Sequence, residues 1–376
     1  MDTNNITTYK IIGLMSGSSL DGLDVVHCLF DIVHIPEFKI LNWQITHAET
    51  ITFDDEILKK LNEAVDYSGR NLVQFDHELG KVFGNMTANF IKRNNLSPDF
   101  ISSHGHTVFH ATQLGFTLQI GHPAEIVATT ELPVVGDFRS TDIALKGQGA
   151  PFAPIVDHWL FSDYDILVNL GGIMNITFLN TPDGVIAYDI GPCNQTLNYL
   201  ASLTGAEYDK DGTMAAAGKT DDNLLQKLKA WPYFELPIPK SLDNSHIKTN
   251  FHNIIDNHTA TVQNKLATMT ELIAFKLAET VNSNKYDSIP RIMLAGGGAF
   301  NNYLVSRMKH YSGDAEMILP DKSVISYKEG LLLALMGLLR IHNIPNVLKS
   351  VTGSKTDHIA GAVYQGIKKQ IHEQYR

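Results

Sequence analysis

The feature that most constrains the fold of this chain is a pattern that occurs twice. Each copy has an apolar run, a glycine-containing turn, a second apolar run and then a third. The first copy occupies residues 11–53 and the second occupies residues 166–189. Apolar and β-branched runs separated by turn residues are typical of strands. The sequence therefore predicts two units that each open with three successive strands, and the likeness of pattern indicates a duplication.

The first glycine turn has the composition of an anion-binding loop. Residues 11–24 contain three glycines, three serines and two aspartates, Asp21 and Asp24. Glycines let successive N–H groups converge on a phosphate, and serines add hydroxyl donors. The loop is neither a Walker A loop nor a Rossmann turn, because a strand rather than a helix follows. The aspartates suit a phosphate only if Mg²⁺ lies between them, or if one faces a substrate hydroxyl. A Gly-Ser hairpin with capping aspartates explains the turn equally well.

A third glycine cluster, Gly296-Gly297-Gly298, lies between an apolar strand at residues 291–295 and a predicted helix at residues 303–310. Bare backbone at a helix N-terminus suits the adenosine or α-phosphate of a nucleotide. The spacing of apolar residues predicts further helices at 54–64, 71–93, 194–203, 222–230, 259–281 and 328–340. Short strands are expected at 100–103, 116–121 and 133–135.

The length of 376 residues predicts two lobes with a cleft between them, because a single core seldom supports so long a chain. The segment 136–151 is rich in charge, glycine and proline, so we expect a loop and a lobe boundary there. Lobe I is predicted to span 1–134, with the C-terminal segment 351–376 packing back on it. Lobe II is predicted to span 135–350.

Charge and cysteine content narrow the class of function. The formal net charge of −10 argues against a nucleic-acid surface. The two cysteines, Cys28 and Cys193, cannot form a disulfide framework, which fits a reducing cytoplasm. No apolar run approaches the ~20 residues of a membrane span, and the polar start lacks a secretion signal. The sequence therefore predicts a cytoplasmic protein with no nucleic-acid or membrane partner.

Two lobes of this pattern resemble the actin, hexokinase and Hsp70 ATPase superfamily. The resemblance implies an α/β, two-lobed actin-like ATPase (ribonuclease H-like) fold with a duplicated β-β-β-α-β-α-β-α core and an interlobe cleft. In that fold two glycine hairpins clamp the phosphates and a third glycine cluster holds the nucleoside. A doubly wound α/β protein with ordinary turn glycines is the alternative.

Six motifs resemble one family of that superfamily, the anhydro-N-acetylmuramic acid kinases, over roughly residues 11–370. The motifs lie at 13–24, Ser-His-Gly-His-Thr-Val at 103–108, Val-Gly-Asp-Phe-Arg at 135–139, Gly-Gln-Gly-Ala-Pro at 147–151, Asn-Leu-Gly-Gly-Ile-Met-Asn at 169–175 and Ala-Gly-Gly-Gly-Ala-Phe-Asn at 295–301. The resemblance implies a bacterial kinase that uses ATP and Mg²⁺. Such a kinase opens the 1,6-anhydro bridge of an anhydro-amino-sugar from cell-wall turnover with water and phosphorylates O6. It also implies a homodimer.

The resemblance assigns roles residue by residue. It implies that Asp189 and Arg139 are catalytic. The residues implied to bind ATP are Gly17, Ser18, Ser19, Leu20, Asp21, Gly22, Leu23, Asp24, Gly171, Gly172, Asn175, Gly296, Gly297, Gly298 and Asn301. Those implied to bind the sugar are Ser16, His104, Thr107, Asp137 and Glu329. Either Asp21 or Asp24 is a candidate for contact with the metal.

Several of these residues have competing explanations. Asp189 ends a strand and suits a general base, although a cap for the helix after Pro192 is the competing role. Arg139 is either a surface charge or a bidentate partner for the sugar's carboxylate or a phosphoryl oxygen. Glu329 could instead be a charge at a helix N-terminus. His104, His106 and His110 invite a metal site, but no fourth ligand is evident.

The chain also departs from the common family pattern. Cys193 replaces a glycine, Asn198 an aspartate, His106 a glutamine and Lys146 a glycine. The segment 239–246 keeps only the Pro-Lys-Ser of a motif that commonly continues with glycine. These departures leave a related kinase for a different sugar as the main alternative. A non-catalytic nucleotide-binding sensor is a second alternative, although a sensor has little need for a base.

Overall fold

The computed structural model describes residues 6–17, 20, 22–34, 37–181, 184–238, 240–284, 286 and 288–367. Ser18, Ser19 and Asp21, which were predicted to bind ATP, lie outside the described residues. The chain divides into two compact units. The first comprises the residues up to Leu160 and those from Tyr327 onward, and the second comprises Phe161–Ser326.

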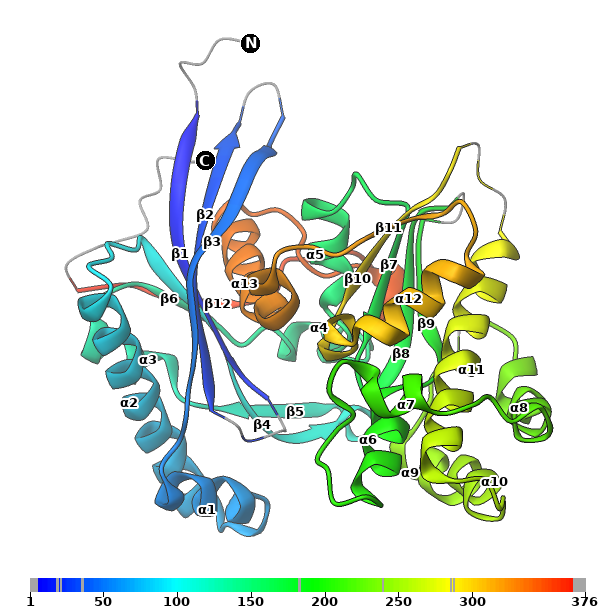
Figure 1. Ribbon diagram of the computed structural model, residues 1–376. Coiled ribbons are helices and arrows are strands. Elements are labelled where there is room, and N and C mark those ends of the chain that lie inside the picture. The colour runs from blue at the N-terminus through cyan, green and yellow to red at the C-terminus, as the bar shows by residue number, and fades with distance from the viewer. Residues whose placement is uncertain are drawn as a thin grey trace. The chain divides into compact units, whose positions relative to one another are not determined.

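The first unit is built on a sheet in the order β12-β6-β4-β1-β2-β3, with β5 paired to β4 (Figure 1). The strands of this sheet are β1 (Thr7–Ser16), β2 (Leu23–Val33), β3 (Lys39–Ile51), β4 (Phe100–Ala111), β5 (Phe116–Ile120), β6 (Val134–Gly136) and β12 (Ala362–Tyr364). The first three strands pair antiparallel, whereas β4 runs parallel to β1 and to β6.

Helices cover both faces of this sheet. Those assigned to the first unit are α1 (Asp55–Glu63), α2 (Gly69–Arg93), α3 (Pro123–Thr130), α4 (Ser140–Ala144), α5 (Ala153–Leu160), most of α13 (Lys322–Ile341) and α14 (Lys349–Thr352). Figure 1 shows α2 and α3 on one face and α13 on the other. The side chains of Asp54 and Ser68 cap the N-termini of α1 and α2. Because both faces are covered, the central strand β1 is apolar on both sides, with Ile11, Ile12 and Leu14 wholly buried.

The second unit repeats the strand pattern of the first. Its sheet has the order β11-β10-β7-β8-β9. The strands are β7 (Ile166–Leu170), β8 (Ile173–Thr181), β9 (Gly184–Pro192), β10 (Arg291–Ala295) and β11 (Glu316–Ile318). Strands β7, β8 and β9 pair antiparallel, and β10 runs parallel to both β7 and β11.

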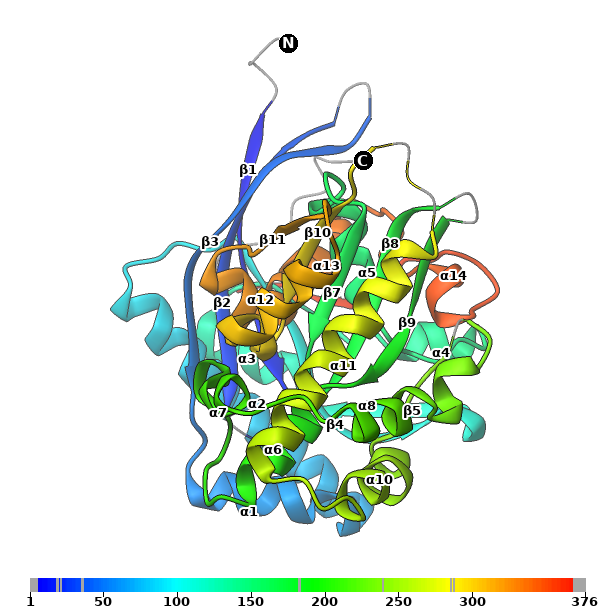
Figure 2. The ribbon, with the colours of Figure 1, turned by 45° about the vertical axis from the view of Figure 1, so that its right-hand side comes forward.

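The core of the second unit lies between this sheet and its helices. The helices are α6 (Asn194–Ser202), α7 (Thr213–Ala217), α8 (Asp222–Lys229), α9 (Asn244–His246), α10 (His252–Asp256), α11 (Val262–Asn282) and α12 (Asn302–Tyr311). Figure 2 shows α11 and α12 in front of strands β7 to β10. The side chain of Thr261 caps α11, whose middle is buried almost all round.

The two sheets have the same topology, which confirms the predicted fold class. In each unit three antiparallel strands are followed by two that extend the sheet in parallel from the first: β3-β2-β1-β4-β6 in one and β9-β8-β7-β10-β11 in the other. The duplication predicted from the pattern of runs is therefore present in the strand order. The interlobe cleft stays a prediction.

The unit boundaries differ from those predicted from composition. Residues 135–160 belong to the first unit, because β6 pairs with β4 and β12. The second boundary falls inside α13, at the non-helical Tyr327 (φ −125°, ψ 23°), rather than near residue 350. The physical reason is close packing, since Gly330 of α13 lies directly against Val26 of β2.

Two local predictions also need correction. The segment 136–151 is not wholly a loop, because it contains α4. Strand β4 does not end at Ser103 but continues through the histidine motif to Ala111, where it pairs with β5. The side chains of His104, His106 and Thr107 are therefore held on a strand.

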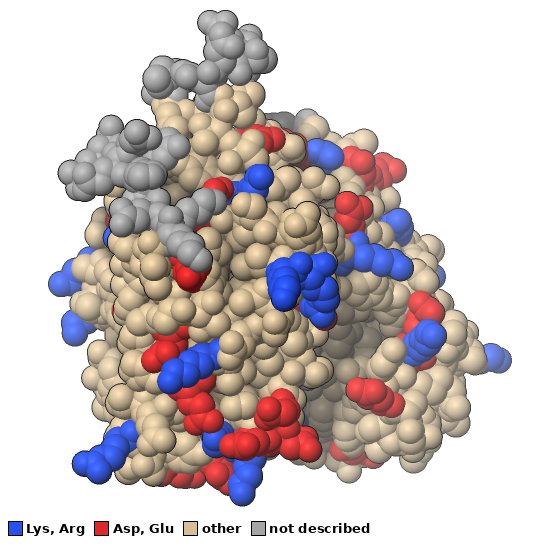
Figure 3. All heavy atoms as spheres, turned by 90° about the vertical axis from the view of Figure 1, so that its left-hand side faces the viewer, with Lys and Arg blue, Asp and Glu red and all other residues tan. Residues whose placement is uncertain are grey.

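The surface of the described residues has mixed charge on the face shown in Figure 3, where acidic and basic side chains lie scattered over a mostly uncharged area. Among the helices that the structure describes, none is both long enough and apolar enough to cross a bilayer.

Candidate active site

The first glycine turn joins β1 to β2. The two strands stay paired as far as Met15 and Asp24. Leu20 has a left-handed backbone (φ 61°), and a Cβ on Gly22 would lie 2.3 Å from the Ile51 carbonyl oxygen. The turn is thus held close to β3, and only glycine fits at position 22. Gly17 and Leu23 are the other described residues of the predicted phosphate loop, and Leu23 is fully buried.

Ser16 ends β1 beside the histidine motif of β4. Its side chain is buried, and its Oγ lies 3.0 Å from Nδ1 of His106. Burial lowers the pKa of His106. Because the neutral ring can exchange a hydrogen bond with the hydroxyl, His106 orients the Ser16 side chain. The sequence did not predict this contact for His106.

His104 and Arg139 form a direct pair, as expected if both serve one site. Arg139 Nε donates to His104 Nε2 at 2.8 Å, and His104 Nδ1 lies 3.0 Å from the Gly105 carbonyl oxygen. A carbonyl oxygen only accepts, so Nδ1 carries the proton and Nε2 is the acceptor. Burial, followed by the charge of Arg139, lowers the pKa of His104 to about 3. His104 is therefore a neutral acceptor that fixes the guanidinium.

The Arg139 guanidinium has two further contacts. Its Nη1 donates to the Gly149 carbonyl oxygen, and its carbon lies 5.1 Å from the centre of the Phe152 ring. Burial lowers the pKa of Arg139, and Glu329 acts in the opposite direction. Within the part of the chain that the structure describes, Nη2 makes no hydrogen bond. Arg139 is thus held on one side, and it is no longer explained as a free surface charge.

Glu329 lies in the first turn of α13 after the interruption at Tyr327. Glu329 is exposed as a whole residue. The surrounding protein nevertheless desolvates its carboxyl, which raises the pKa of that group, and the charge of Asp24 raises the same pKa further. Arg139 lowers the same pKa. Asp24 accepts a hydrogen bond from Thr50 Oγ1 at 2.6 Å. The structure thus brings Asp24 and Arg139 each within electrostatic reach of Glu329.

Thr107 and Asp137 are the remaining predicted sugar contacts. Thr107 Oγ1 accepts from Gln119 Nε2 at 3.2 Å on the adjacent strand. Asp137 is exposed, has a left-handed backbone (φ 58°), and accepts from the Ser140 amide at 3.4 Å. In the described residues, no hydrogen bond joins either side chain to Arg139. Their roles in binding stay predictions.

Asp189 lies on β9 of the second unit. Its Oδ2 accepts from the Leu242 amide at 2.8 Å and from Ser241 Oγ at 3.4 Å, and its backbone oxygen accepts from Tyr233 OH at 2.8 Å. Burial raises the pKa of the Asp189 carboxyl, and the bonds from Leu242 and Ser241 oppose that shift. Among the described residues, Oδ1 accepts no hydrogen bond. The carboxylate is therefore oriented through one oxygen, which leaves the other for a ligand.

The capping role considered for Asp189 is excluded. The N-cap of α6 is Cys193, which makes no side-chain capping bond, and the Asp189 carboxylate is bonded to residues 241 and 242 instead.

The second glycine turn, Gly171-Gly172, lies against the N-terminus of α6. The Gly171 carbonyl accepts from the Asn194 amide, and the Gly172 carbonyl accepts from the amides of Cys193 and Gln195. Asn175 lies opposite Asp189 in the β8–β9 ladder. The predicted phosphate turn joins β7 to β8 and the predicted base lies on β9, so both belong to the same antiparallel part of one sheet.

The glycine triplet follows β10, and its first and third residues must be glycine for close packing. A Cβ on Gly296 (φ 79°) would lie 2.5 Å from Asn169 Oδ1, and one on Gly298 would lie 2.7 Å from Leu170 Cβ. Gly297 is exposed, and a Cβ there would make an ordinary contact with Asn194 Nδ2 at 3.8 Å. Asn301 Oδ1 caps α12 by accepting from the Leu304 amide. Its side chain therefore has a structural role, whatever its part in binding.

A pocket of about 450 Å³ opens beside this triplet, within the range of small-molecule sites. Its lining comes from three segments of the second unit: Gly297, Gly298, Phe300 and Asn301; Asn194, Leu197 and Asn198; and Tyr208, Asp209, Lys210 and Asp211. Tyr208 and Phe300 are both substantially exposed. The pocket combines exposed backbone, two aromatic rings and a lysine, which suits a nucleoside phosphate.

Sequence reasoning missed two groups of residues in this site. The first group holds Asp189 from about 50 positions away along the chain, and it consists of Tyr233, Ser241 and Leu242. Ser241 belongs to the Pro-Lys-Ser motif noted in the sequence, but its contact with Asp189 was not predicted. The 208–211 segment lines the pocket, and its only signal was a turn-like composition. The histidines considered for a metal do not gather. Among the described residues, no three His, Cys, Asp or Glu side chains are grouped so as to hold a metal ion.

Comparisons with known proteins agree with the motifs. The family model described as "Anhydro-N-acetylmuramic acid kinase" matches residues 9–366. A protein of that name from Coxiella burnetii is 33% identical over 374 residues, covering 96% of this chain and 98% of its own length. Proteins of that name from Hydrogenovibrio crunogenus and Pasteurella multocida are each 32% identical, covering 94% and 95% of this chain and 97% of their own lengths.

Similar solved structures are more distant. An activator of 2-hydroxyisocaproyl-CoA dehydratase from Clostridium difficile aligns with a TM-score of 0.40 and 11% identity over 87% of this chain and 93% of its own length. That similarity is too low to support a conclusion about fold or function. The family match and the curated relatives span nearly the whole chain, and on that basis this protein belongs to the anhydro-N-acetylmuramic acid kinase family.

Proposed function

We propose that this protein phosphorylates 1,6-anhydro-N-acetylmuramic acid at O6 with ATP while water opens the anhydro bridge, giving N-acetylmuramic acid 6-phosphate for cell-wall recycling. The observation that carries the proposal is the state of Asp189. Among the described residues, its carboxylate accepts hydrogen bonds through one oxygen only, in a partly buried setting that raises its pKa. An oriented carboxylate with a raised pKa and one available oxygen is what a general base requires.

In the proposed reaction Asp189 removes a proton from water as the water oxygen bonds to the anomeric carbon. The bond between that carbon and the bridge oxygen breaks, and the bridge oxygen bonds to the γ-phosphorus of ATP. ADP leaves with the electrons of the β–γ bridging bond, and the proton on Asp189 passes to solvent. Atoms and charge balance, because one water is consumed for each sugar phosphorylated.

On the nucleotide side, we assign the pocket beside Gly297 to the nucleoside of ATP. The exposed rings of Tyr208 and Phe300 can stack with a base, and Lys210 supplies a positive charge for a phosphate. The turns 17–24 and 171–172 are the proposed phosphate loops. Their glycines permit backbone N–H groups to approach the anion, and this part of the proposal rests on that chemistry.

Mg²⁺ is part of the proposal. Protein sites for Mg²⁺ commonly supply only one or two carboxylates, with water and phosphate oxygens completing the shell. Asp24 fits this requirement as a hard oxygen donor oriented by Thr50. The ion would neutralise phosphate charge during transfer.

On the sugar side, we assign Arg139 to an acidic group of the substrate, with Ser16, His104, Thr107, Asp137 and Glu329 as further contacts. The neutral His104 and the Gly149 carbonyl hold one side of the guanidinium. The Nη2 edge, which makes no hydrogen bond within the described residues, suits a carboxylate or a phosphoryl oxygen.

The test is an assay of the purified protein with ATP, Mg²⁺ and 1,6-anhydro-N-acetylmuramic acid. We expect stoichiometric ADP and a 6-phosphosugar, with oxygen from ¹⁸O-labelled water at the anomeric carbon, observed by mass spectrometry. ATP turnover with other sugars but never with this one would reject the proposed substrate.

The pH dependence of turnover gives a second prediction. Because burial raises the pKa of Asp189, activity should fall with decreasing pH at values above those of an ordinary aspartate. The Ser241 hydroxyl lowers that pKa, so Ser241→Ala should move the acidic limb of log kcat to higher pH by a few tenths of a unit, about the effect of one weak hydrogen bond. A limb that stays in place, or moves to lower pH, would contradict this account of the base.

A related kinase for a different sugar is the second candidate. The observation in its favour is that His106, a departure from the family pattern, contacts the predicted sugar ligand Ser16. A comparison of kcat/KM among anhydro-sugars that differ at the lactyl and acetamido groups decides between the two candidate substrates. The homodimer and the cytoplasmic location also belong to the proposal, and light scattering of the purified protein tests the first.

A further inference from the structure

Asp142 is a wholly buried carboxylate in the first unit that none of the proposed steps uses. It lies on the short helix α4, three residues after Arg139. Its Oδ2 accepts from the Gly149 amide at 2.6 Å, and its Oδ1 accepts from Thr352 Oγ1 at 2.7 Å. His358 Nε2 lies 3.6 Å from the same Oδ1. A buried carboxylate is costly unless hydrogen-bonded, so these donors hold it in one orientation.

The Gly149 amide and carbonyl face two different side chains. The amide donates to Asp142, and the carbonyl accepts from Arg139 Nη1. The turn also packs closely, since a Cβ on Gly147 would lie 2.2 Å from Asp142 Oδ2. The position of the carbonyl that holds Arg139 therefore depends on the bond that Asp142 makes with the same residue.

A C-terminal segment, residues 346–358, fixes Asp142 and the loop together. Besides its hydroxyl bond to Asp142, Thr352 accepts from the Gln148 amide through its carbonyl oxygen at 2.8 Å. The Lys355 amide donates to the Leu145 carbonyl at 3.2 Å. Asn346, fully buried, bonds to the carbonyls of Met336 and Ala360. This segment is thus anchored to α13 at one end. At the other end it is anchored to residues 145–149, the loop that follows α4 and holds Arg139 through the Gly149 carbonyl.

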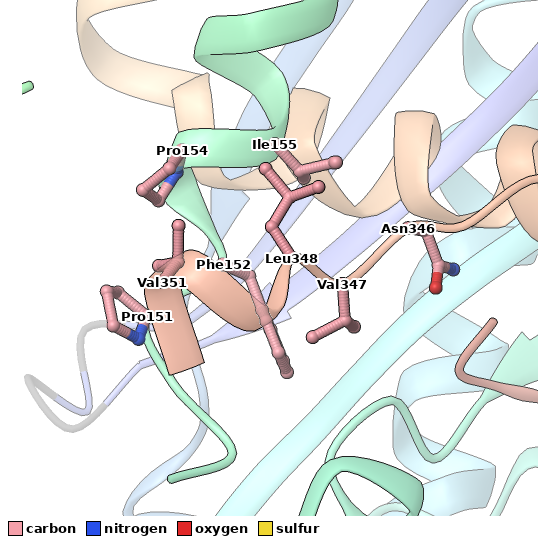
Figure 4. Close-up of a pocket in the computed structure, with 8 residues that line it drawn as sticks. All are labelled: Pro151, Phe152, Pro154, Ile155, Asn346, Val347, Leu348 and Val351. Carbon is pink, nitrogen blue, oxygen red and sulfur yellow. The ribbon is translucent and has the colours of Figure 1, made fainter. Parts of the chain in front are cut away.

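Apolar contacts reinforce the junction. Figure 4 shows Pro151, Phe152, Pro154 and Ile155 facing Val347, Leu348 and Val351 around a narrow pocket. The cavity is about 10 Å³, roughly the space of one water, so the two segments are closely packed. Phe152, whose ring lies under the Arg139 guanidinium, is among these residues.

We propose that Asp142 and Thr352 are positioning residues for Arg139, acting through the backbone of Gly149, so that the C-terminal segment sets the geometry of the sugar-binding arginine. This inference rests on the proposed function for the role of Arg139, but the bracing of the loop does not depend on it. A buried, charge-assisted network of this kind holds a guanidinium more rigidly than a mobile loop does.

The first experiment measures the loop without any substrate. Thr352→Val removes the hydroxyl and keeps the shape, and hydrogen exchange by mass spectrometry follows the amides of residues 147–149. We expect exchange about tenfold faster than in the wild type, because Asp142 loses one of its donors. Thr352→Ser should restore slow exchange. The matched control is Thr87→Val, which removes another buried hydroxyl of the same unit, bonded to the Phe83 carbonyl on α2.

The second experiment measures kinetics with ATP and the anhydro-sugar. Thr352→Val should lower kcat/KM for the sugar about tenfold, a typical effect for a displaced binding group, while KM for ATP changes less than about twofold. In an Arg139→Lys background the same substitution should have little further effect, because the group that it positions is already altered. Thr352→Ser and Thr87→Val should match the wild type.

The outcomes separate the two proposals. Unchanged exchange in Thr352→Val, or exchange no faster than in Thr87→Val, overturns the bracing of the loop whatever the enzyme phosphorylates. Faster exchange with independent, multiplying effects of Thr352→Val and Arg139→Lys overturns the link to Arg139. A wild-type protein that phosphorylates only another sugar rejects the proposed substrate, and the double-mutant comparison is then made with that sugar.

Discussion

Asp189→Asn is expected to lower the rate of anhydro-sugar phosphorylation by about 10³-fold, the loss typical when a general base is removed. The amide has nearly the same shape, and its oxygen can still accept from the Leu242 amide, so the fold should be kept. In the proposed mechanism, what is lost is the group that takes a proton from water. The measurement is single-turnover formation of the 6-phosphosugar, with ATP binding followed separately by calorimetry.

The control for this variant is Asp165→Asn in the same unit. Asp165 also accepts a backbone hydrogen bond through its carboxylate, from the Arg291 amide at 2.9 Å, but it precedes β7 whereas the glycine turn follows that strand. We expect this control to keep activity within about twofold, as for a substitution outside the reacting groups. If Asp189→Asn retained most of the activity while binding ATP normally, Asp189 would not be the base.

The second large effect is on stability, at Gly13. This residue lies in the middle of β1, where a Cβ would be 1.9 Å from the Gly330 carbonyl oxygen and 3.1 Å from the Ala334 amide. Both are backbone atoms of α13, so no side chain can move aside. Gly13→Ala should therefore push α13 from the sheet and lower the free energy of unfolding by about 3 kcal/mol, the upper range for overpacked cores.

Denaturant unfolding monitored by circular dichroism measures this change. Gly69→Ala is the matched control, because a Cβ at the first residue of α2 meets nothing within 4 Å. We expect that control to change stability by no more than about 1 kcal/mol, in the stabilising direction. Equal stability of Gly13→Ala and the wild type would contradict the contact between β1 and α13.

Local patterns predicted most of the secondary structure and the fold. The first three strands, the long helices α2 and α11, and the recurrence at residues 166–189 all follow from spacing that neighbouring residues carry. The boundaries between the two units could not be predicted from such local patterns. Composition pointed to the polar segment near residue 136, whereas contacts between distant segments, such as β6 with β12, decide where a unit ends.

The same division holds at the candidate site. The sequence by itself determined which residue types are present: the glycine turns, Asp189, Arg139 and the histidine motif, together with the family to which they belong. Only the tertiary structure decided how they are held. It showed that Ser241 and Leu242 orient Asp189, that His104 is a neutral acceptor for Arg139, and that Thr352 reaches Asp142 across 210 positions. The reason is physical: chemistry belongs to a residue's own atoms, whereas orientation and pKa depend on neighbours that only folding brings together.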